Sequence, residues 1–198
     1  MEYNILVASV GGQGGVTLAR IISQAAMLQG LNVRVGETLG MAQRGGAVQS
    51  HIRIGDSVHG FVIPHGRANV LLSLEPSESV RAPEYIGPET KVLMNTSFIH
   101  PIQTLLGNQK IVDLNSITTI LKELSPQIIT IDAKKITLSV EAPNSLNIVI
   151  LGAYAALNDG VLTEWSLRES MFNLIPKRFH KENIRAYESG YEEILNII

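Results

Sequence analysis

Residues 5–17 read ILVASVGGQGGVT, and the fold is best predicted from this stretch. Its first six residues are apolar or small, as in a buried strand, and a helical pattern of apolar residues opens at Val16. The glycine-rich segment 11–15 is therefore predicted to be a strand-to-helix turn with exposed backbone N–H groups. Such turns bind anions, because unpaired N–H groups and the helix dipole both attract negative charge.

A second glycine-rich segment, residues 37–46 with the sequence ETLGMAQRGG, follows the next predicted strand at residues 32–35. It combines the carboxylate of Glu37, the guanidinium of Arg44 and three glycines. In α/β sheets the ligand crevice lies beside the turns that follow the strands. We therefore predict that both segments face one site.

These two segments contain all the residues that we predict to contact a cofactor. The glycines allow a ligand to approach the backbone closely, and the side chain of Gln13 can add a hydrogen bond. Glu37 stands about where a nucleotide-binding fold places a ribose-binding acid, and Arg44 can pair in bidentate fashion with a carboxylate or phosphate. The predicted cofactor-binding residues are Gly12, Gln13, Gly14, Gly15, Val16, Glu37, Arg44 and Gly45.

Each segment also has a purely structural interpretation. The first can be a tight turn that binds nothing: it lacks the lysine of a P-loop, and Thr17 replaces the last glycine of a dinucleotide-binding turn. In the second, Glu37 can be a solvated carboxylate paired with Arg34 or Arg44. For a five-residue turn with four glycines we favour ligand binding.

The rest of the chain alternates strands and helices. The further predicted strands are residues 47–54, their hairpin partner 58–63, and the buried runs 70–74, 91–94 and 128–131. The predicted helices are residues 16–29, one that starts at 75–78, then 116–124, 148–157, 166–175 and 184–197. We predict an α/β fold with a doubly wound, mostly parallel, Rossmann-like sheet, a β-hairpin insertion and a helical C-terminal part. Within residues 47–54, alternation predicts a polar face with Gln49, His51 and Arg53.

Length and composition narrow the classes of function. At 198 residues the chain is expected to be one domain, residues 1–198. Its charged share of 17% is below the usual quarter, which indicates that a partner covers part of the surface. The formal net charge of −2, with scattered basic residues, argues against nucleic acid as a ligand. Because no apolar run of about 18 residues and no basic leader are present, we expect a cytoplasmic protein with no membrane contact.

The sequence contains few candidates for catalytic or metal-binding residues. It has no cysteine, which excludes thiol catalysis and cysteine-ligated clusters on this chain. His51, His59 and His65 lack the convergent acids of a metal site, so we assign neither a metal ligand nor a catalytic residue.

Several stretches of the sequence resemble the gamma-type subunit, or domain, of the 2-oxoacid:ferredoxin oxidoreductases. They are residues 11–16, 37–46, 50–55, 74–76 and 147–153. The sequence GMAQRGG at residues 40–46 most resembles the beta-subunit subfamily of the indolepyruvate ferredoxin oxidoreductases, whereas pyruvate and 2-oxoglutarate gamma subunits share mainly the RGG.

The resemblance implies a heteromeric enzyme that converts an aryl 2-oxoacid such as indolepyruvate, coenzyme A and oxidised ferredoxin to acyl-CoA, carbon dioxide and reduced ferredoxin. It implies that thiamine diphosphate, Mg²⁺ and [4Fe–4S] clusters lie on a large alpha subunit, through which ferredoxin is reduced. Residues 55–57 read Gly-Asp-Ser and lack the final glycine of the thiamine motif, so we expect this chain alone to bind no cofactor. Our hypothesis is that coenzyme A contacts the turn at residues 12–16, next to Arg44.

Other functions remain open at this point. The chain can be the gamma subunit of a pyruvate or 2-oxoglutarate oxidoreductase. It can also be a stand-alone oxidoreductase that binds NAD with the glycine turn and Glu37, or a non-catalytic assembly module whose glycine segments only pack against a partner.

Overall fold

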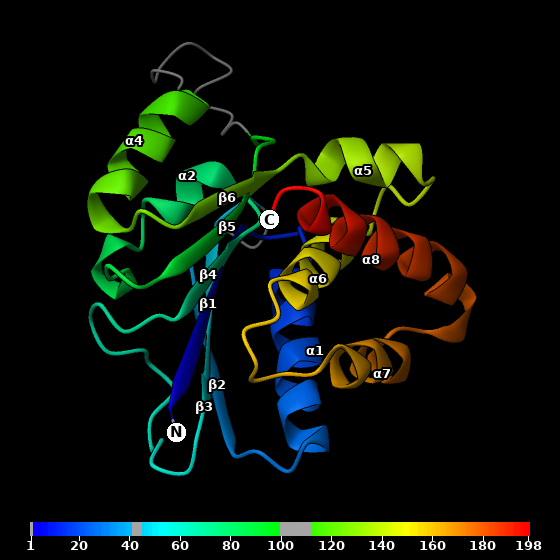
Figure 1. Cartoon of the computed structure of the whole chain (residues 1–198), viewed down its shortest axis with the longest axis horizontal. Coiled ribbons are helices and arrows are strands. Elements are labelled where there is room, and N and C mark those ends of the chain that lie inside the picture. Colours follow the sequence, from blue (N-terminus) through cyan, green and yellow to red (C-terminus); the bar gives the residue numbers. More distant parts are fainter. Residues whose placement is uncertain (1, 41–44, 100–111) are drawn as a thin grey trace.

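The computed structural model describes residues 2–40, 45–99 and 112–198, and its centre is a six-stranded sheet (Figure 1). The strand order is β2-β3-β1-β4-β5-β6. β1, β4, β5 and β6 run parallel to one another, whereas β3 is antiparallel to both β1 and β2. The strands are β1 (Tyr3–Val10), β2 (Val33–Leu39), β3 (Ala47–Ile54), β4 (Val70–Ser73), β5 (Lys91–Asn95) and β6 (Ile128–Ile131).

Helices cover both faces of the sheet. They are α1 (Gly15–Leu28), α2 (Pro76–Ser79), α4 (Leu114–Leu124), α5 (Ala133–Ser139), α6 (Leu146–Ala156), α7 (Glu164–Leu174) and α8 (His180–Leu195), with 3₁₀ turns η1 (Pro83–Tyr85) and η2 (Lys177–Phe179). α2 and α4 lie on one face, and α1, α6, α7 and α8 lie on the other (Figure 1). The predicted doubly wound, mostly parallel α/β fold is confirmed, and the short helix α5 is an element that the sequence pattern did not predict.

The strand predicted at residues 47–54, which is β3, forms its hairpin with a different strand than predicted. Residues 58–63 form no strand, and β2, which is longer than predicted, pairs with β3 instead. A Cβ atom at Gly36 of β2 would stand 2.0 Å from Cδ2 of Phe61, so the segment 58–63 crosses the face of the β2–β3 hairpin. Arg53 of β3 holds this segment, because its Nη1 donates to two carbonyl oxygens of the segment over 3.0 and 3.1 Å.

The predicted polar face of β3 is covered by this later part of the chain. His51 is fully buried, and its ring lies edge-on to the Tyr85 ring at 4.9 Å between centroids. Its Nδ1 accepts a hydrogen bond from the N–H of Ile63 over 3.4 Å. Burial lowers the pKa of His51, so the imidazole favours its neutral form. The alternation located the strand correctly, but it could not reveal that another segment folds over it.

Two glycines allow the helices α6 and α8 to pack closely. A Cβ at Gly152 of α6 would lie 2.0 Å from the carbonyl oxygen of Tyr187, and one at Gly190 of α8 would lie 2.1 Å from that of Val149. α6 and α8 therefore touch through their backbones, and α6 is almost entirely buried between α8 and the sheet. In the parts of the chain that the structure describes, no helix is long and apolar enough to cross a membrane.

Candidate functional site

The turn between β1 and α1 requires its glycines. Gly12 and Gly14 have φ angles of +102° and +83°, a conformation that residues with a Cβ rarely adopt. A Cβ at Gly15 would stand 2.2 Å from Oγ of Ser9, so this position also has no room for a side chain. The predicted strand-to-helix turn is therefore present, and its form depends on both backbone conformation and close packing.

The described part of the second glycine-rich segment lies beside this turn. The N–H of Gly11 donates to the carbonyl oxygen of Gly46 over 2.8 Å, and the N–H of Gly45 donates to that of Gly11 over 3.3 Å. Arg44 lies outside the described residues. Glu37 is exposed within β2, at the edge of the sheet, where its backbone pairs with Ser50 of β3. The two glycine segments thus meet, whereas Glu37 belongs to a strand rather than to a loop.

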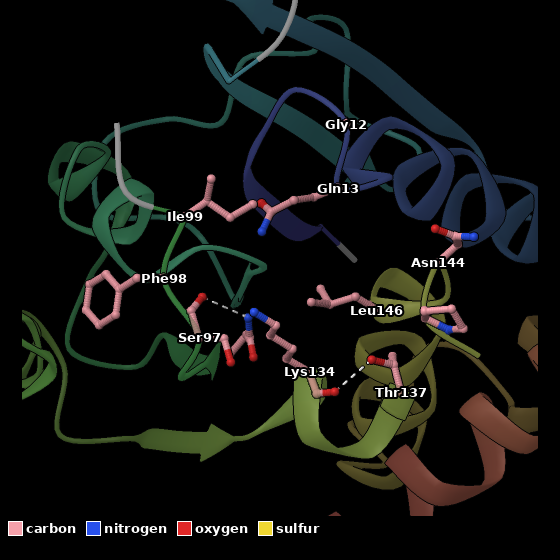
Figure 2. A pocket seen from close by; sticks show the side chains of 11 residues that line it. Gly12, Gln13, Ser97, Phe98, Ile99, Lys134, Thr137, Asn144 and Leu146 are labelled. Carbon is pink, nitrogen blue, oxygen red and sulfur yellow. Dashed lines mark hydrogen bonds between the residues drawn. The ribbon is translucent and has the colours of Figure 1, made fainter. Parts of the chain in front are cut away.

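A pocket of about 280 Å³ opens at the carboxyl ends of β1 and β5, and we call it the switch-point pocket (Figure 2). Its walls are the β1–α1 turn at Gly12 and Gln13, the end of β5 with residues 97–99, and the first turns of α5 and α6. β1 leads into a helix on one face of the sheet and its neighbour β4 leads into a helix on the other face. In α/β sheets, ligands bind at such a change of direction.

Two helices begin at this pocket without a side-chain cap. The N-caps of α1 and α6 are Gly14 and Ser145, and neither helix has a capping hydrogen bond from its N-cap side chain. The two helix starts are joined, because Nδ2 of Asn147 donates to the carbonyl oxygen of Gly14 over 3.2 Å. Unpaired N–H groups and two helix dipoles therefore favour negative charge in this region.

Lys134 brings a positive charge to the same pocket. It is the second residue of α5, and Figure 2 shows its side chain extending from that helix toward Ser97. The neighbouring carboxylate of Asp132 is used as the N-cap of α5, since it accepts hydrogen bonds from the N–H of Lys135 and from Oγ of Ser97 over 2.9 and 3.3 Å. An ammonium group and helix N-termini together suit a phosphate or carboxylate.

Gln13, a predicted ligand contact, uses its side chain largely within the protein. Its Oε1 accepts a hydrogen bond from the N–H of Val10, and its Nε2 donates to the carbonyl oxygen of Leu74, both over 3.0 Å. The side chain therefore ties the end of β1 to the end of β4 at the pocket wall. One N–H of the carboxamide is left over from this pair of hydrogen bonds.

A buried acid, Glu75, supports the rim of the pocket next to Ile99. Oε1 of Glu75 accepts a hydrogen bond from the N–H of Ile99 over 3.3 Å, and Oε2 accepts one from the N–H of Glu78 over 3.1 Å. Burial raises the pKa of Glu75 and of Glu78. The guanidinium of Arg81 offsets part of the rise at Glu78, and the neighbouring Glu75 adds to it. The short helix α2 thus begins with a carboxylate cap that also fixes the chain after β5.

Sequence reasoning missed Asn95, Lys134 and Asn147 as parts of the site. Asn95 is a polar residue directly after the predicted buried strand 91–94, which was a usable signal. Asn147 stands in one of the stretches that carried the family resemblance. Lys134 gave no signal, because the helix that positions it has only seven residues and follows the strand after a single residue.

Comparison with known proteins agrees with this fold and these motifs. A family model described as pyruvate ferredoxin/flavodoxin oxidoreductase matches residues 4–193. The indolepyruvate oxidoreductase subunit IorB of Methanothermobacter thermautotrophicus is 40% identical, over 96% of this chain and 97% of that protein. The chain therefore belongs to the pyruvate ferredoxin/flavodoxin oxidoreductase family.

Two solved structures are similar in fold. The gamma subunit of the keto/oxoacid ferredoxin oxidoreductase from Geobacter sulfurreducens superposes with a TM-score of 0.71 at 22% identity, over 98% of this chain and 99% of that chain. The 2-oxoglutarate:ferredoxin oxidoreductase from Magnetococcus marinus, solved with 2-oxoglutarate, coenzyme A and succinyl-CoA bound, gives a TM-score of 0.72 at 19% identity. That match covers 100% of this chain and 31% of the other, so the same fold occurs there as part of a longer polypeptide.

Proposed function

We propose that this chain is the small subunit of an indolepyruvate:ferredoxin oxidoreductase and that its switch-point pocket holds the phosphate-bearing part of coenzyme A. The complex would convert an aryl 2-oxoacid, coenzyme A and oxidised ferredoxin to acyl-CoA, carbon dioxide and reduced ferredoxin. Support for the substrate class comes from the GMAQRGG sequence at residues 40–46 and from the 40% identity to a relative named for indolepyruvate.

The observation that carries the proposal for the pocket is the meeting of α1, α6 and Lys134 at the switch point of the sheet. Each uncapped helix start favours an anion by about 0.3–1 kcal/mol, and a hydrogen bond from an ammonium group to a phosphate contributes about 1.5–3 kcal/mol. Coenzyme A carries several phosphates. The coenzyme A named in the Magnetococcus marinus structure, which shares this fold, is consistent with this ligand.

The residues present do not fit the other cofactors of the reaction. Iron–sulfur clusters are held by cysteine thiolates, and the sequence has no cysteine. Asp56, within the Gly-Asp-Ser turn, accepts a hydrogen bond from Asn32 at the opposite end of the sheet from the pocket. We therefore assign thiamine diphosphate, Mg²⁺ and the [4Fe–4S] clusters to a large alpha subunit, which supplies the decarboxylation and electron-transfer chemistry. Ferredoxin is then reduced through that subunit.

The stand-alone NAD enzyme fits less well. Its ribose-binding acid would be Glu37, which lies on the edge strand β2, two strands from β1, and does not line the pocket. A stand-alone enzyme predicts NAD binding by the isolated chain. A pyruvate or 2-oxoglutarate gamma subunit instead predicts that the reconstituted complex prefers one of those acids to indolepyruvate when all three are compared at equal concentration.

Equilibrium binding of isotope-labelled coenzyme A to the reconstituted complex tests the proposed site. We expect Lys134→Met to weaken binding about tenfold, the loss of one charge-assisted hydrogen bond. Lys91→Met is the matched control, because Lys91 begins the strand β5 whose other end forms the pocket, and its affinity should be unchanged. Unchanged affinity in Lys134→Met would contradict the proposal.

Arg44 is tested separately in the same assay. Our hypothesis places its guanidinium beside the glycine turn, so Arg44→Ala should weaken coenzyme A binding. Unchanged affinity would remove Arg44 from the site while leaving the role of Lys134 intact.

A further inference from the structure

Two side-chain carboxamides meet on one carbonyl group behind the switch-point pocket. Nε2 of Gln13 and Nδ2 of Asn95 donate to the carbonyl oxygen of Leu74, the residue after β4, over 3.0 and 2.9 Å. A carbonyl oxygen has two lone pairs, so it can accept both donors at once. Because Gln13 also binds the N–H of Val10, this single oxygen joins the ends of β1, β4 and β5.

Asn95 extends the connection to the helix that presents Lys134. Its Oδ1 accepts a hydrogen bond over 3.2 Å from the N–H of Ala133, a group at the start of α5 that the helix itself cannot satisfy. Its Nδ2 also donates to the carbonyl oxygen of Ser97 over 3.2 Å. Asn95 is fully buried, and Lys134 directly follows Ala133. Asn95 therefore holds the first turn of α5, from which Lys134 projects, together with the Asp132 cap.

We propose that Gln13 and Asn95 are positioning residues for the anion site. Their shared contact with the Leu74 carbonyl fixes the β1–α1 turn on one side of the pocket relative to Lys134 on the other. Both donors of the Asn95 carboxamide are used inside the protein, so Asn95 acts on the ligand through the groups that it holds. This inference rests on the proposed function of the pocket and adds the residues that set its geometry.

The chemistry of these two side chains makes the proposal specific. Leucine in place of Asn95, or methionine in place of Gln13, keeps a similar volume but removes every hydrogen bond. The carbonyl of Leu74 then loses a donor, and in Asn95→Leu the N–H of Ala133 is left buried without its acceptor. The first turn of α5 and the glycine turn can then shift relative to each other, and small displacements at a binding site cost affinity steeply.

The test uses the reconstituted complex with its partner subunit and compares KM for coenzyme A with kcat. We expect Asn95→Leu and Gln13→Met each to raise KM for coenzyme A about tenfold, with kcat at saturating coenzyme A changed less than about twofold. Asn4→Leu is the matched control: Asn4 is also a buried asparagine of the sheet, at the opposite end of β1, and its Nδ2 donates to the carbonyl oxygen of Arg67 over 2.9 Å. It should lower thermal stability to a similar extent and leave KM unchanged.

A double variant distinguishes positioning from general loosening. If Asn95 acts through Lys134, adding Asn95→Leu to Lys134→Met should raise KM by clearly less than the product of the two single effects. The proposal would be overturned if the rise of KM in the double variant equals the product of the two single effects. An equal rise of KM in Asn4→Leu would also overturn it. So would unchanged KM in both Asn95→Leu and Gln13→Met.

Lys134→Met separates this inference from the function on which it rests. If Lys134→Met raises KM while Asn95→Leu and Gln13→Met do not, the positioning proposal fails and the anion site stands. If none of the three changes KM, the proposed function fails together with the inference. Should Asn95→Leu not assemble, Gln13→Met carries the same test, since Gln13 reaches the same carbonyl from the other side.

Discussion

At the two ends of the sheet, the cationic side chains of Arg53 and Lys134 have different surroundings. Where β1 begins, the guanidinium of Arg53 is enclosed by hydrogen bonds to Glu2, Asn4 and the segment 58–63. Where β1 ends, two helices start without side-chain caps, and Lys134 extends into a pocket. Polar groups that are paired internally stabilise the fold, whereas polar groups that face a pocket are available to a ligand. The difference supports the proposed site at the pocket end of the sheet.

Arg53→Met should have the largest effect on stability and none on the ligand. The side chain is 11% exposed and makes four hydrogen bonds, so its loss leaves Asn4 and two backbone carbonyls short of a donor. We expect the free energy of unfolding to fall by about 2–4 kcal/mol, measured by urea denaturation of the full chain. Weaker coenzyme A binding by the complex would contradict the assignment of Arg53 to stability alone.

Gly14→Ala and Gly66→Ala compare the two ends at the level of the backbone. Both glycines have positive φ angles, +83° and +68°. At Gly66 nothing lies within 4 Å of a new Cβ, so strain alone should cost about 1 kcal/mol. At Gly14 the Cβ would stand 2.7 Å from Nδ2 of Asn147, which links α1 to α6, so we expect a larger loss in thermal unfolding and weaker coenzyme A binding. Equal losses would mean that the α1–α6 contact yields easily.

Glu78→Gln should stabilise the protein at neutral pH. Burial raises the pKa of Glu78 above its ordinary value of 4.5, so ionisation costs stability in the folded state. The stability of the folded state with a neutral Glu78 carboxyl is complete below about pH 4.5, and it is lost as the pH rises through the folded pKa. We expect Glu78→Gln to be more stable than the natural chain at pH 7 and to have no advantage under acid conditions. A gain that is independent of pH would contradict this explanation.

Glu2, at the other end of the sheet, should show the opposite pH dependence. The hydrogen bond from Arg53 is the main reason that the pKa of Glu2 is lowered. Its contribution is therefore present above the unfolded pKa of 4.5 and is lost as the pH falls through the folded value. Glu2→Gln should slightly flatten the acid side of the stability profile, a small effect because this carboxylate is partly exposed. An unchanged acid limb would show that the ion pair adds nothing.

The sequence predicted the elements that local patterns define. β1, the glycine turn and α1 follow from an apolar run, glycines at positive φ and a helical stripe, and β6 has the predicted bounds. The partner of β3 was wrong, because Val58 to Ile63 alternate well enough for a strand while Phe61 in fact covers Gly36. Such packing depends on residues far apart in the chain, which period and composition cannot report.

Only the local part of the candidate site could be predicted from the sequence. The glycine turn is a local feature and was placed correctly beside Gly45 and Gly46. Asn95 and Lys134 reach the pocket only because the ends of β1, β4 and β5 are brought together and a seven-residue helix follows β6. Only the folded chain places these two residues at one pocket.

Hydrogen exchange of the reconstituted complex with and without coenzyme A would show where on this chain the ligand binds. If the ligand binds at the carboxyl ends of the strands, backbone amides of residues 11–17 and 144–149 should exchange more slowly when coenzyme A is added. Amides of residues 55–69, at the other end of the sheet, should be unaffected. Protection confined to that other end, or no protection anywhere in this chain, would contradict the account.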